Sequence, residues 1–317
     1  MRAVEKLAMR DACAQVLVDC FDEVPGLVVL DADVSKSTRS AEFARAHPER
    51  FLNVGIAEQN MVSIAAGLAA AGMVPVVNTF SMLLSMRALD QIRQSVAYPK
   101  LNVKLMGHYG GYSAGPEGPT HHAVEDLGII RSIPHTTLLV PCDATEARGA
   151  IRAALAFDGP VYVRLCRNPV PPVLAEPRPF EIGRGYEVRS GGDLTIVATG
   201  VMVARGLEAA EILASRGLDA RVVAMSSLKP IDGAILEKAA RETGAIVTAE
   251  EHNVYGGLGS AVAEVLVETV PVPMVRVGIK DCFAESGDYF ELMDRYGLSV
   301  GDVVVAAERV LERKMRG

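Results

Sequence analysis

Short apolar runs alternate with segments of helical periodicity along the first 170 residues. Each run spans four or five residues and is followed by a longer segment whose apolar positions recur at helical spacing. This alternation is typical of βαβ units that build a parallel sheet. The predicted strands are Gly26–Leu30, Val74–Val77, Val103–Met106, Thr137–Val140 and Val161–Leu165; the predicted helices are Val4–Val24, Ala57–Ala71 (capped by Gly72), Leu83–Val96 and Thr145–Phe157.

A proline-rich segment separates this pattern from a second one. Five prolines lie between Pro169 and Pro179, a density that neither a helix nor a central strand tolerates. The sequence therefore predicts an α/β protein of two domains, residues 1–170 and 183–317, each a mostly parallel sheet flanked by helices, with a linker over 171–182. The second domain has predicted strands at Leu194–Ala198, Ala220–Ala224, Ala245–Thr248 and Met274–Val277 and predicted helices at Ala204–Arg216, Gly233–Thr243 and Gly259–Val267.

Composition excludes several classes of function. The 317 residues carry 32 Lys and Arg against 39 Asp and Glu, a net charge of −7. Nonspecific binding of nucleic acid needs surplus cations to release counterions from phosphates, so this balance argues against such a partner. Five cysteines without a CxxC pair, and an N-terminus without an apolar signal region, favour the cytoplasm over secretion.

One uncharged stretch, Gln59–Met86, superficially resembles a membrane span. It is rich in Ala, Gly and Ser, and Gly72, Pro75 and Asn78 interrupt it. A helix, a turn and a buried strand fit this composition better than one continuous span. We therefore expect no membrane association.

Glu58 begins the predicted Ala-rich helix, after Ile56 and Ala57 and before the uncharged segment Met61–Ala71. One explanation is structural, because a carboxylate at a helix N-terminus interacts favourably with the macrodipole. The apolar surroundings favour a second explanation, in which the side chain is shielded from water. A shielded carboxyl group holds a proton more readily near neutral pH, as general acid–base chemistry requires.

The segment Gly107–Asp126 carries five glycines, two prolines and three histidines directly after a predicted strand. A loop of this length in a compact domain is more often functional than idle. His121 and His122 are adjacent and point in different directions, and no HxH or HxxxH spacing supports a metal site. We expect one of them to handle substrate or protons while the other packs.

Two further motifs have simpler explanations. Gly257–Ala261 (GLGSA) resembles part of a dinucleotide-binding fingerprint, but it does not leave a strand directly and lacks the later acidic residue. We expect a packing turn before a helix there. Cys142 and Cys166 follow strands without a histidine–acid partner, so we expect small core residues.

Four short motifs, in this order and at this spacing, resemble the C-terminal half of transketolases. They are GIAEQN at 55–60, Asn78-Thr79-Phe80, Glu117-Gly118-Pro119-Thr120-His121 and Val163-Arg164-Leu165-Cys166-Arg167. The resemblance covers the whole chain, as a pyrimidine-binding domain to about residue 170 and then the transketolase C-terminal domain. 1-Deoxyxylulose-5-phosphate synthase is the nearest sibling group, and the β-chains of 2-oxoacid dehydrogenases share the architecture.

The resemblance implies that the chain binds thiamine diphosphate. Glu58 matches the glutamate that hydrogen-bonds N1′ of the aminopyrimidine, and this bond prepares the cofactor to attack a ketose carbonyl. Phe80 matches the aromatic residue that packs on the pyrimidine, and His121 matches the histidine that bonds donor-sugar hydroxyls. Asp33 falls in the segment that, in the family, lies against the cofactor of the neighbouring subunit.

Arg10, Ser37 and Arg167 match positions that bind the phosphate of a sugar phosphate in transketolases. Two guanidinium groups and a hydroxyl suit a phosphate through charge-assisted hydrogen bonds. The alternative for either arginine is a surface ion pair that contributes little. The three positions together favour a phosphorylated substrate.

The sequence departs from the family pattern at four site positions. Leu83 and Met86 replace an aromatic residue and a tyrosine beside the pyrimidine, which reduces stacking. Glu117 replaces the usual aspartate that is tied to donor hydroxyls. Tyr109 stands where the family has a phosphate-binding histidine, with His108 one residue away. We therefore expect a donor or acceptor that differs from the common sugar phosphates.

Nothing in this sequence resembles the Gly-Asp-Gly motif with which full-length transketolases bind Mg²⁺ and the diphosphate. A diphosphate needs a hard cation with oxygen ligands. The resemblance therefore implies a separate N-terminal subunit that holds Mg²⁺ or Ca²⁺, with no metal ligands expected in this chain, and a homodimer of this chain within a heterotetramer.

The favoured hypothesis is the C-terminal subunit of a thiamine-diphosphate-dependent transketolase, which moves a two-carbon ketol unit from a ketose to an aldose. A deoxyxylulose-phosphate-synthase-like or 2-oxoacid-decarboxylating component is the alternative among enzymes, and His121 and Glu117 argue mildly against decarboxylation. A noncatalytic scaffold subunit is the alternative of another class. Retention of Glu58, Phe80 and His121 argues against it.

Overall fold

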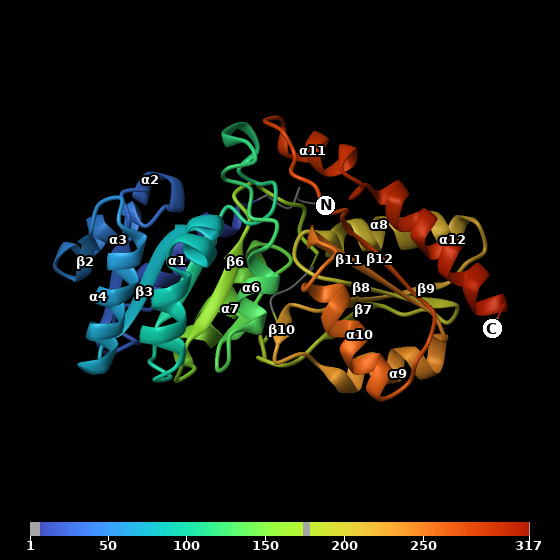
Figure 1. Cartoon of the computed structure of the whole chain (residues 1–317), viewed down its shortest axis with the longest axis horizontal. Coiled ribbons are helices and arrows are strands. Elements are labelled where there is room, and N and C mark those ends of the chain that lie inside the picture. The colour runs from blue at the N-terminus through green and yellow to red at the C-terminus, as the bar shows by residue number, and fades with distance from the viewer. Residues whose placement is uncertain (1–6, 174–177, 317) are drawn as a thin grey trace.

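The computed structural model describes residues 7–173 and 178–316. Figure 1 shows two α/β units side by side, one from each half of the chain, and so confirms the predicted fold class. The helices are α1 (Met9–Asp19), α2 (Ser35–Thr38), α3 (Ala41–Ala46), η1 (Pro48–Arg50), α4 (Glu58–Ala70), η2 (Leu83–Arg87), α5 (Leu89–Gln91), η3 (Ile92–Ala97), η4 (Gly115–Glu117), α6 (Asp126–Ser132), α7 (Ala144–Ala156), α8 (Met202–Ser215), α9 (Gly233–Thr243), α10 (Leu258–Glu268), α11 (Tyr289–Arg295) and α12 (Val300–Arg316).

The first sheet has seven strands in the order β10-β5-β6-β4-β3-β1-β2. Its members from the first half of the chain are β1 (Leu27–Asp31), β2 (Phe51–Asn53), β3 (Val74–Phe80), β4 (Lys104–His108), β5 (Thr137–Leu139) and β6 (Val161–Leu165). These six are parallel to one another. Their carboxyl ends lie at one edge of the sheet, where open α/β sheets bind ligands.

The second sheet has five strands in the order β12-β11-β8-β9-β7. They are β7 (Tyr186–Arg189), β8 (Leu194–Ala198), β9 (Ala220–Ala224), β11 (Ile246–Asn253) and β12 (Met274–Ile279). Only the pairing of β7 with β9 is antiparallel among the pairs described for this sheet. The predicted strands therefore correspond to the four parallel ones, and the short edge strand β7 was not predicted because it is only partly buried.

The segment predicted as one helix over Leu83–Val96 is divided. η2 and η3 are π-helical, with backbone hydrogen bonds from Ala88 N to Leu83 O and from Tyr98 N to Arg93 O at 3.2 and 3.0 Å. The three residues of α5 separate them. Turns of this kind are frequent at functional sites, and a hydrophobic pattern does not distinguish them from α-helical turns.

Helix α4 begins with Glu58 and ends one residue before its predicted boundary. Gly72 adopts φ +90°, with Met73 N donating to Leu68 O and Gly72 N to Ala69 O, both at 3.0 Å. This is the Schellman arrangement, which satisfies the last carbonyls of a helix and favours glycine after the cap. The helix predicted over Val4–Val24 is too long at its C-terminal end, because α1 ends at Asp19. Residues 4–6 of that prediction lie outside the described part of the chain.

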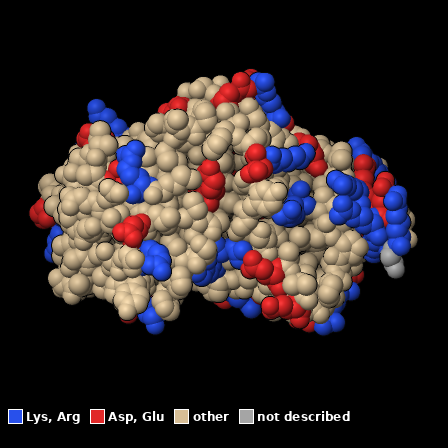
Figure 2. Space-filling view, viewed as in Figure 1, with Lys and Arg blue, Asp and Glu red and all other residues tan. Residues whose placement is uncertain are grey.

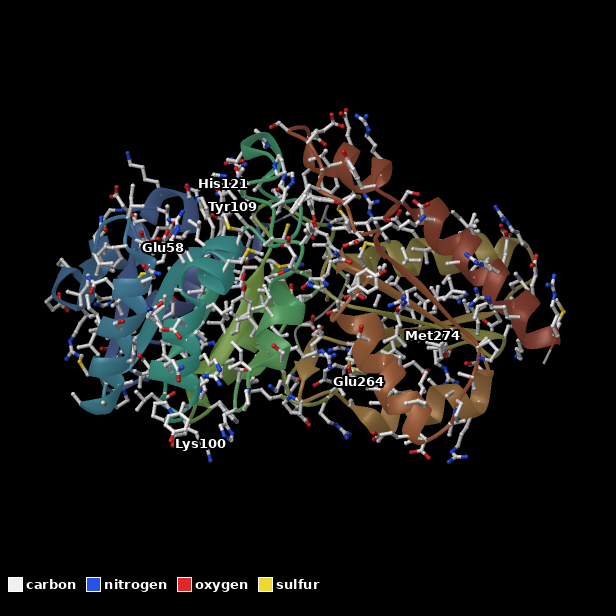
Figure 3. All side chains as sticks on the ribbon, in the orientation of Figure 1. Glu58, Lys100, Tyr109, His121, Glu264 and Met274 are labelled. Atoms are coloured by element: carbon white, nitrogen blue, oxygen red, sulfur yellow. The ribbon has the colours of Figure 1, made fainter. Side chains whose placement is uncertain are left out.

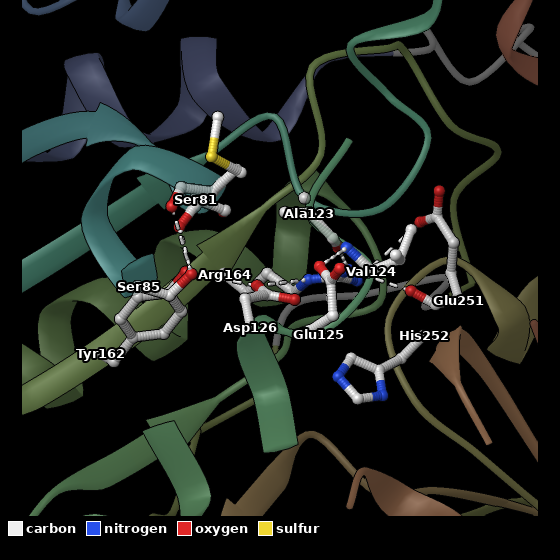
Figure 4. A network of polar contacts seen from close by, with 12 residues as sticks. Ser81, Ser85, Ala123, Val124, Glu125, Asp126, Tyr162, Arg164, Glu251 and His252 are labelled. Carbon is white, nitrogen blue, oxygen red and sulfur yellow. Dashed lines mark hydrogen bonds and ion pairs between the residues drawn. The ribbon is translucent and has the colours of Figure 1, made fainter. Parts of the chain in front are cut away.

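The two units are joined by buried contacts. Arg164, 6% exposed, donates from Nε to Asp126 Oδ2 at 3.0 Å, and from Nη2 to the carbonyl oxygens of Ala123 and Glu251 at 2.8 and 2.9 Å. Glu251 Oε1 accepts a hydrogen bond from the backbone N–H of Tyr112 at 2.7 Å. Figure 4 shows Arg164 of this network together with Asp126, Ala123 and Glu251.

A short strand also crosses between the units. β10 (Ser227–Lys229) comes from the second half of the chain but pairs antiparallel with β5 of the first sheet. The described residues of the predicted linker, 171–173 and 178–182, contain no helix or strand. None of the helices in the described part of the chain has the length and apolar character needed to cross a membrane.

Candidate active site

The predicted site residues follow strands that end at the same edge of the first sheet. Ser37 lies beyond the end of β1, Phe80 ends β3, Tyr109 follows β4 and Arg167 follows β6. Strands β1, β3, β4 and β6 are consecutive neighbours in the sheet. The parallel topology therefore gathers residues that are up to 130 positions apart in sequence, 37 against 167.

Glu58 is buried at the first turn of α4, with 1% of its surface exposed. Its Oε2 accepts a hydrogen bond from Arg87 Nη1 at 2.9 Å, and the Arg87 side chain is 47% exposed. Its Oε1 is buried and has no hydrogen-bond partner within the described residues. Burying a carboxylate oxygen without a partner is unfavourable relative to water, and this atom is free to accept a hydrogen bond from a donor outside the described residues.

Helix η2 connects Glu58 to the other site residues. Arg87 ends this helix, and Leu83 at its start packs in a buried cluster with Phe80, Tyr109 and Ala114. Met86, on the same helix, is 39% exposed. The two replacements for aromatic residues thus have different environments, since Leu83 fills the cluster and Met86 faces outward.

Phe80 lies between two other rings. Its centroid is 4.3 Å from that of Tyr109, with an interplanar angle of 33°, and 6.1 Å from that of His121 in an edge-on arrangement. His121 is half-buried, and its Nδ1 lies 3.0 Å from Thr120 Oγ1. Figure 3 shows Tyr109 and His121 close together above the sheet, with Glu58 farther along the same unit.

Two arginines flank the ring of Tyr109. The guanidinium carbons of Arg10 and Arg167 lie 5.9 and 5.0 Å from its centroid. Arg10 Nη1 donates to Tyr109 Oη at 3.2 Å and to the carbonyl oxygen of Ser37 at 3.0 Å. Arg167 Nη1 lies 3.7 Å from Glu117 Oε2. Arg10, Ser37 and Arg167, the three residues matched to phosphate-binding positions, therefore lie together around Tyr109, with Glu117 beside Arg167.

The structure distinguishes Tyr109 from His108. His108 is fully buried and its Nε2 lies 3.0 Å from Asn78 Oδ1. Burial, and secondarily the charge of Arg10, lowers the pKa of His108 to about 3, so its ring is neutral. Tyr109, at φ +61°, turns its ring toward the arginines instead. His122 is likewise buried, edge-on to Tyr112 at 5.2 Å, while His121 lies at the site.

The turn after β1 is held by Asp31. Its carboxylate accepts hydrogen bonds from Val34 N, Thr38 Oγ1 and Ser40 Oγ at 2.7, 2.9 and 2.8 Å, and burial raises its pKa. Asp33, the predicted residue, is exposed at φ +64° and its Oδ1 accepts a hydrogen bond from Asn53 Nδ2 at 3.2 Å. Asp31 thus shapes the segment that presents Asp33 and Ser37.

Arg87 was not predicted as a site residue, although the sequence carries a signal for it. Glu58 and Arg87 are the charged residues that bracket the uncharged stretch Gln59–Met86. A helix followed by a strand brings the two ends of this stretch back to the same edge of the sheet. A negative residue at one end of an uncharged helix–strand unit and a positive residue at the other end therefore indicate an ion pair.

The remaining candidates are structural. Glu250, fully buried, accepts hydrogen bonds from the backbone N–H groups of Leu258 and Gly259 at 2.6 and 2.8 Å, so these two amides of the GLGSA turn are not free to bind a phosphate. Burial raises the pKa of the Cys166 thiol to about 12 and of the Cys142 thiol well above its usual range. Within residues 7–173 and 178–316, no three His, Cys, Asp or Glu side chains form a cluster suited to a metal ion.

Two family descriptions match this chain. The transketolase pyrimidine-binding domain matches residues 5–172, and the transketolase C-terminal domain matches residues 183–303. The site described above lies in the first of these regions, apart from the contacts that hold the two units together.

Individual relatives agree with this assignment. The chain is 43% identical over 311 residues to the 6-deoxy-6-sulfo-D-fructose transketolase subunit SqwH of Clostridium sp. (strain MSTE9), covering 98% of this chain and 97% of that one. It is 37% identical to a subunit of the apulose-4-phosphate transketolase of Phocaeicola vulgatus, covering 92% of this chain and 94% of that one. A solved structure described as a split gene transketolase, inactive beta4 tetramer, matches with a TM-score of 0.90 and 47% identity, covering 98% of this chain and all of that one. The chain therefore belongs to the transketolase family, in which it corresponds to the C-terminal subunit of split enzymes.

Proposed function

We propose that this chain is the C-terminal subunit of a thiamine-diphosphate-dependent transketolase that transfers a two-carbon ketol unit from a ketose to an aldose. The observation that carries the proposal is Glu58, a buried carboxylate at the start of α4 with one oxygen that lacks a partner in the described residues. Burial of such a group is unfavourable for folding. Its presence is therefore better explained by function than by stability.

The residues present fit the cofactor that the family uses. Glu58 Oε1 would bond the aminopyrimidine, Phe80 and Leu83 would pack against the ring, and Met86 and Asp33 would contact it at the subunit boundary. When bound, thiamine diphosphate supplies a nucleophilic carbon and an electron sink for breaking a carbon–carbon bond. Glu58 Oε1 would share a proton with the cofactor, while the hydrogen bond from Arg87 to Oε2 holds the carboxylate in place.

The proposed substrate is a ketose with an acidic terminal group. Arg10 and Arg167 supply cations, with the Ser37 segment and Tyr109 positioning Arg10. Both named relatives act, by their names, on sugars that carry an acidic group, one a sulfonate and one a phosphate. His121, half-buried beside Phe80, would bond hydroxyls of the donor.

The proposal includes a separate N-terminal subunit that holds the diphosphate and its metal, and a homodimer of this chain within a heterotetramer. Large apolar side chains near Glu58 are uncovered, with Ile56 75%, Leu52 40% and Met86 39% exposed. On the face in Figure 2, the first unit shows broad uncharged areas, whereas charged side chains gather toward α12. Exposed apolar surface at a candidate site favours coverage by another subunit. The cytoplasm is the proposed compartment.

The test is reconstitution of the enzyme from its parts. The purified chain, the purified N-terminal subunit and the mixture are each assayed for ketol transfer with thiamine diphosphate and Mg²⁺ over a panel of ketose donors. The proposal predicts turnover only in the mixture. Full activity of this chain alone, or no transfer from any ketose in a mixture that forms a stable complex, would contradict it.

A further inference from the structure

We propose that Glu117 weakens the binding of a phosphate dianion at the anion subsite beside Tyr109 more than it weakens the binding of a terminal acid group with a single negative charge, such as a sulfonate or carboxylate. The inference rests on the proposed function for the location of the subsite. It goes beyond that function because a ketol-transferring enzyme needs no particular charge at the far end of its sugar.

The first observation is the charge of the subsite. Around Tyr109, the guanidinium groups of Arg10 and Arg167 stand beside one carboxylate, that of Glu117, so two cationic groups and one anionic group would face a ligand. Arg39 and Asp11, which follow Ser37 and Arg10 in the sequence, form an ion pair at 2.9 Å and together add no net charge. A phosphate monoester carries about −1.5 to −2 at pH 7 because its second pKa is about 6. A sulfonate or carboxylate carries −1, so Glu117 repels it about half as strongly as it repels a dianion.

The second observation is where Glu117 is held. Its Oε2 lies 3.7 Å from Arg167 Nη1, and each side chain is about a third exposed, at 33% and 32%. Glu117 ends the short turn η4, and Gly118 follows at φ +78°, where a Cβ would lie 2.6 Å from Ser286 Oγ. The backbone after Glu117 is therefore restricted, and the long side chain reaches the guanidinium that an anionic ligand would use.

The third observation is the state of the donors. Arg10 Nη1 is already committed to Tyr109 Oη and to the carbonyl oxygen of Ser37. Tyr109 Oη accepts that bond, so its own hydrogen remains for a ligand oxygen. Arg10 Nε is buried without a partner among the described residues. The subsite thus combines the neutral hydroxyl of Tyr109 with two cations. Arg10 already donates to protein oxygens, and Arg167 is paired with Glu117.

The consequence follows from Coulomb's law. Repulsion between Glu117 and a bound acid scales with the ligand's charge, so a dianion is weakened about twice as much as a monoanion at the same position. At a partly exposed site, one extra unit of charge within a few ångströms changes affinity by roughly tenfold. Removing the charge of Glu117 should therefore improve phosphate binding more than sulfonate binding.

The experiment measures binding to the chain in complex with its N-terminal subunit and thiamine diphosphate. Ligands are open-chain polyols, which lack the keto group and cannot react: glucitol, glucitol 6-phosphate, its 6-deoxy-6-sulfonate and the corresponding 6-carboxylate. Dissociation constants are determined by calorimetry for the wild type, Glu117→Gln, Glu117→Asp and Arg167→Ala. Glu312→Gln, an exposed position on α12, is the control for a change in overall charge.

We expect Glu117→Gln to tighten the phosphate about tenfold more than the sulfonate, and Glu117→Asp, which withdraws the carboxylate by one methylene, to have a smaller effect of the same sign. Arg167→Ala should weaken every charged polyol and leave glucitol unchanged, and Glu312→Gln should change nothing. Comparison of the sulfonate with the carboxylate identifies the preferred monoanion. An equal effect of Glu117→Gln on phosphate and sulfonate would overturn the inference. Turnover of an uncharged ketose by the same complex is measured separately, so that its absence counts against the proposed function and not against the charge preference.

Discussion

His108 and Tyr109 are consecutive residues whose side chains point in different directions, and only Tyr109 lies beside the arginines of the candidate site. The side chain of His108 points into the sheet, where its Nε2 lies beside Asn78 Oδ1, and that of Tyr109 turns toward Arg10 and Arg167. Neighbouring side chains of a strand point to opposite faces, and the positive φ at Tyr109 ends the alternation just after β4. Both residues appeared as candidates in the sequence, but only the backbone geometry separates them.

His108 makes the stability of the protein depend on pH. Its pKa in the folded state is about 3, and an unfolded histidine has a pKa of about 6.5. Between these values the unfolded state binds more protons, so the free energy of unfolding falls as the pH falls. At pH 5 the loss relative to pH 7 from this residue is roughly 2 kcal/mol.

The variant His108→Gln should therefore lose about 2 kcal/mol less than the wild type between pH 7 and pH 5, whatever its stability at pH 7. Urea unfolding at fixed protein concentration gives the two differences. His135→Gln, at an exposed position, is the control and should follow the wild type. Parallel losses in His108→Gln and the wild type would show that His108 is not buried in its neutral form.

At the scale of elements, the longer parallel strands and most of the longer helices were predictable because each has a clear period and a clear stop, but the predictions did not include α12. The five strands predicted in the first domain and the helix that begins at Glu58 all appear, within a few residues at their ends. The π-helical turns η2 and η3 were not predictable, because one extra residue per turn hardly changes an apolar pattern over five residues. Their effect is large, since η2 carries both Leu83 and Arg87 to the site.

The Schellman end of α4 gives a test with a single cause. Gly72 has φ +90° and no atom within 4 Å of the position of an added Cβ, so only backbone strain opposes a side chain there. Gly72→Ala should lower the free energy of unfolding by about 1 kcal/mol. Gly192→Ala, which also has open space but no positive φ, should stay within about 0.5 kcal/mol of the wild type. Equal values for the two variants in urea unfolding would contradict the assignment of strain.

At the scale of the whole molecule, the ion pairs at the junction of the two units have very different surroundings. Arg164 and Asp126 form part of a buried network that also reaches Glu251, with side chains 6% and 0% exposed. Arg131 and Glu264 form a pair at the surface, with Glu264 60% exposed. A buried charge left without its partner is strongly unfavourable, whereas an exposed pair contributes little.

Arg164→Gln should therefore reduce the free energy of unfolding by about 3–5 kcal/mol, and Glu264→Gln by less than about 1 kcal/mol. Both are measured by urea unfolding of the same assembly. Arg164 lies in the Val163–Arg167 motif, which also contains Arg167 of the candidate site. Cofactor binding by the complex is therefore measured as a second readout. Glu264→Gln should leave it unchanged. A loss below about 1 kcal/mol for Arg164→Gln would mean that the buried network does not hold the units together.

The family and the fold of the whole chain were recognisable from four short motifs, because most of their residues lie at strand ends or helix starts that the topology brings to one edge. The joint between the units was not recognisable, since Arg164, Asp126 and Glu251 are far apart in sequence and each looks like an ordinary charged residue. The three-residue strand β10 was missed because three residues are too few to show a period.

The proposed chemistry depends on Glu58 donating or accepting a proton at a cofactor held between subunits. The most direct measurement compares ketol transfer by complexes containing the wild type or Glu58→Gln, with assembly checked by size-exclusion chromatography and bound thiamine diphosphate quantified in each. Glutamine keeps the shape of the side chain but cannot serve as the acid–base group, so kcat should fall at least about 100-fold while assembly stays intact. A Glu58→Gln complex with near wild-type turnover would contradict the proposed role.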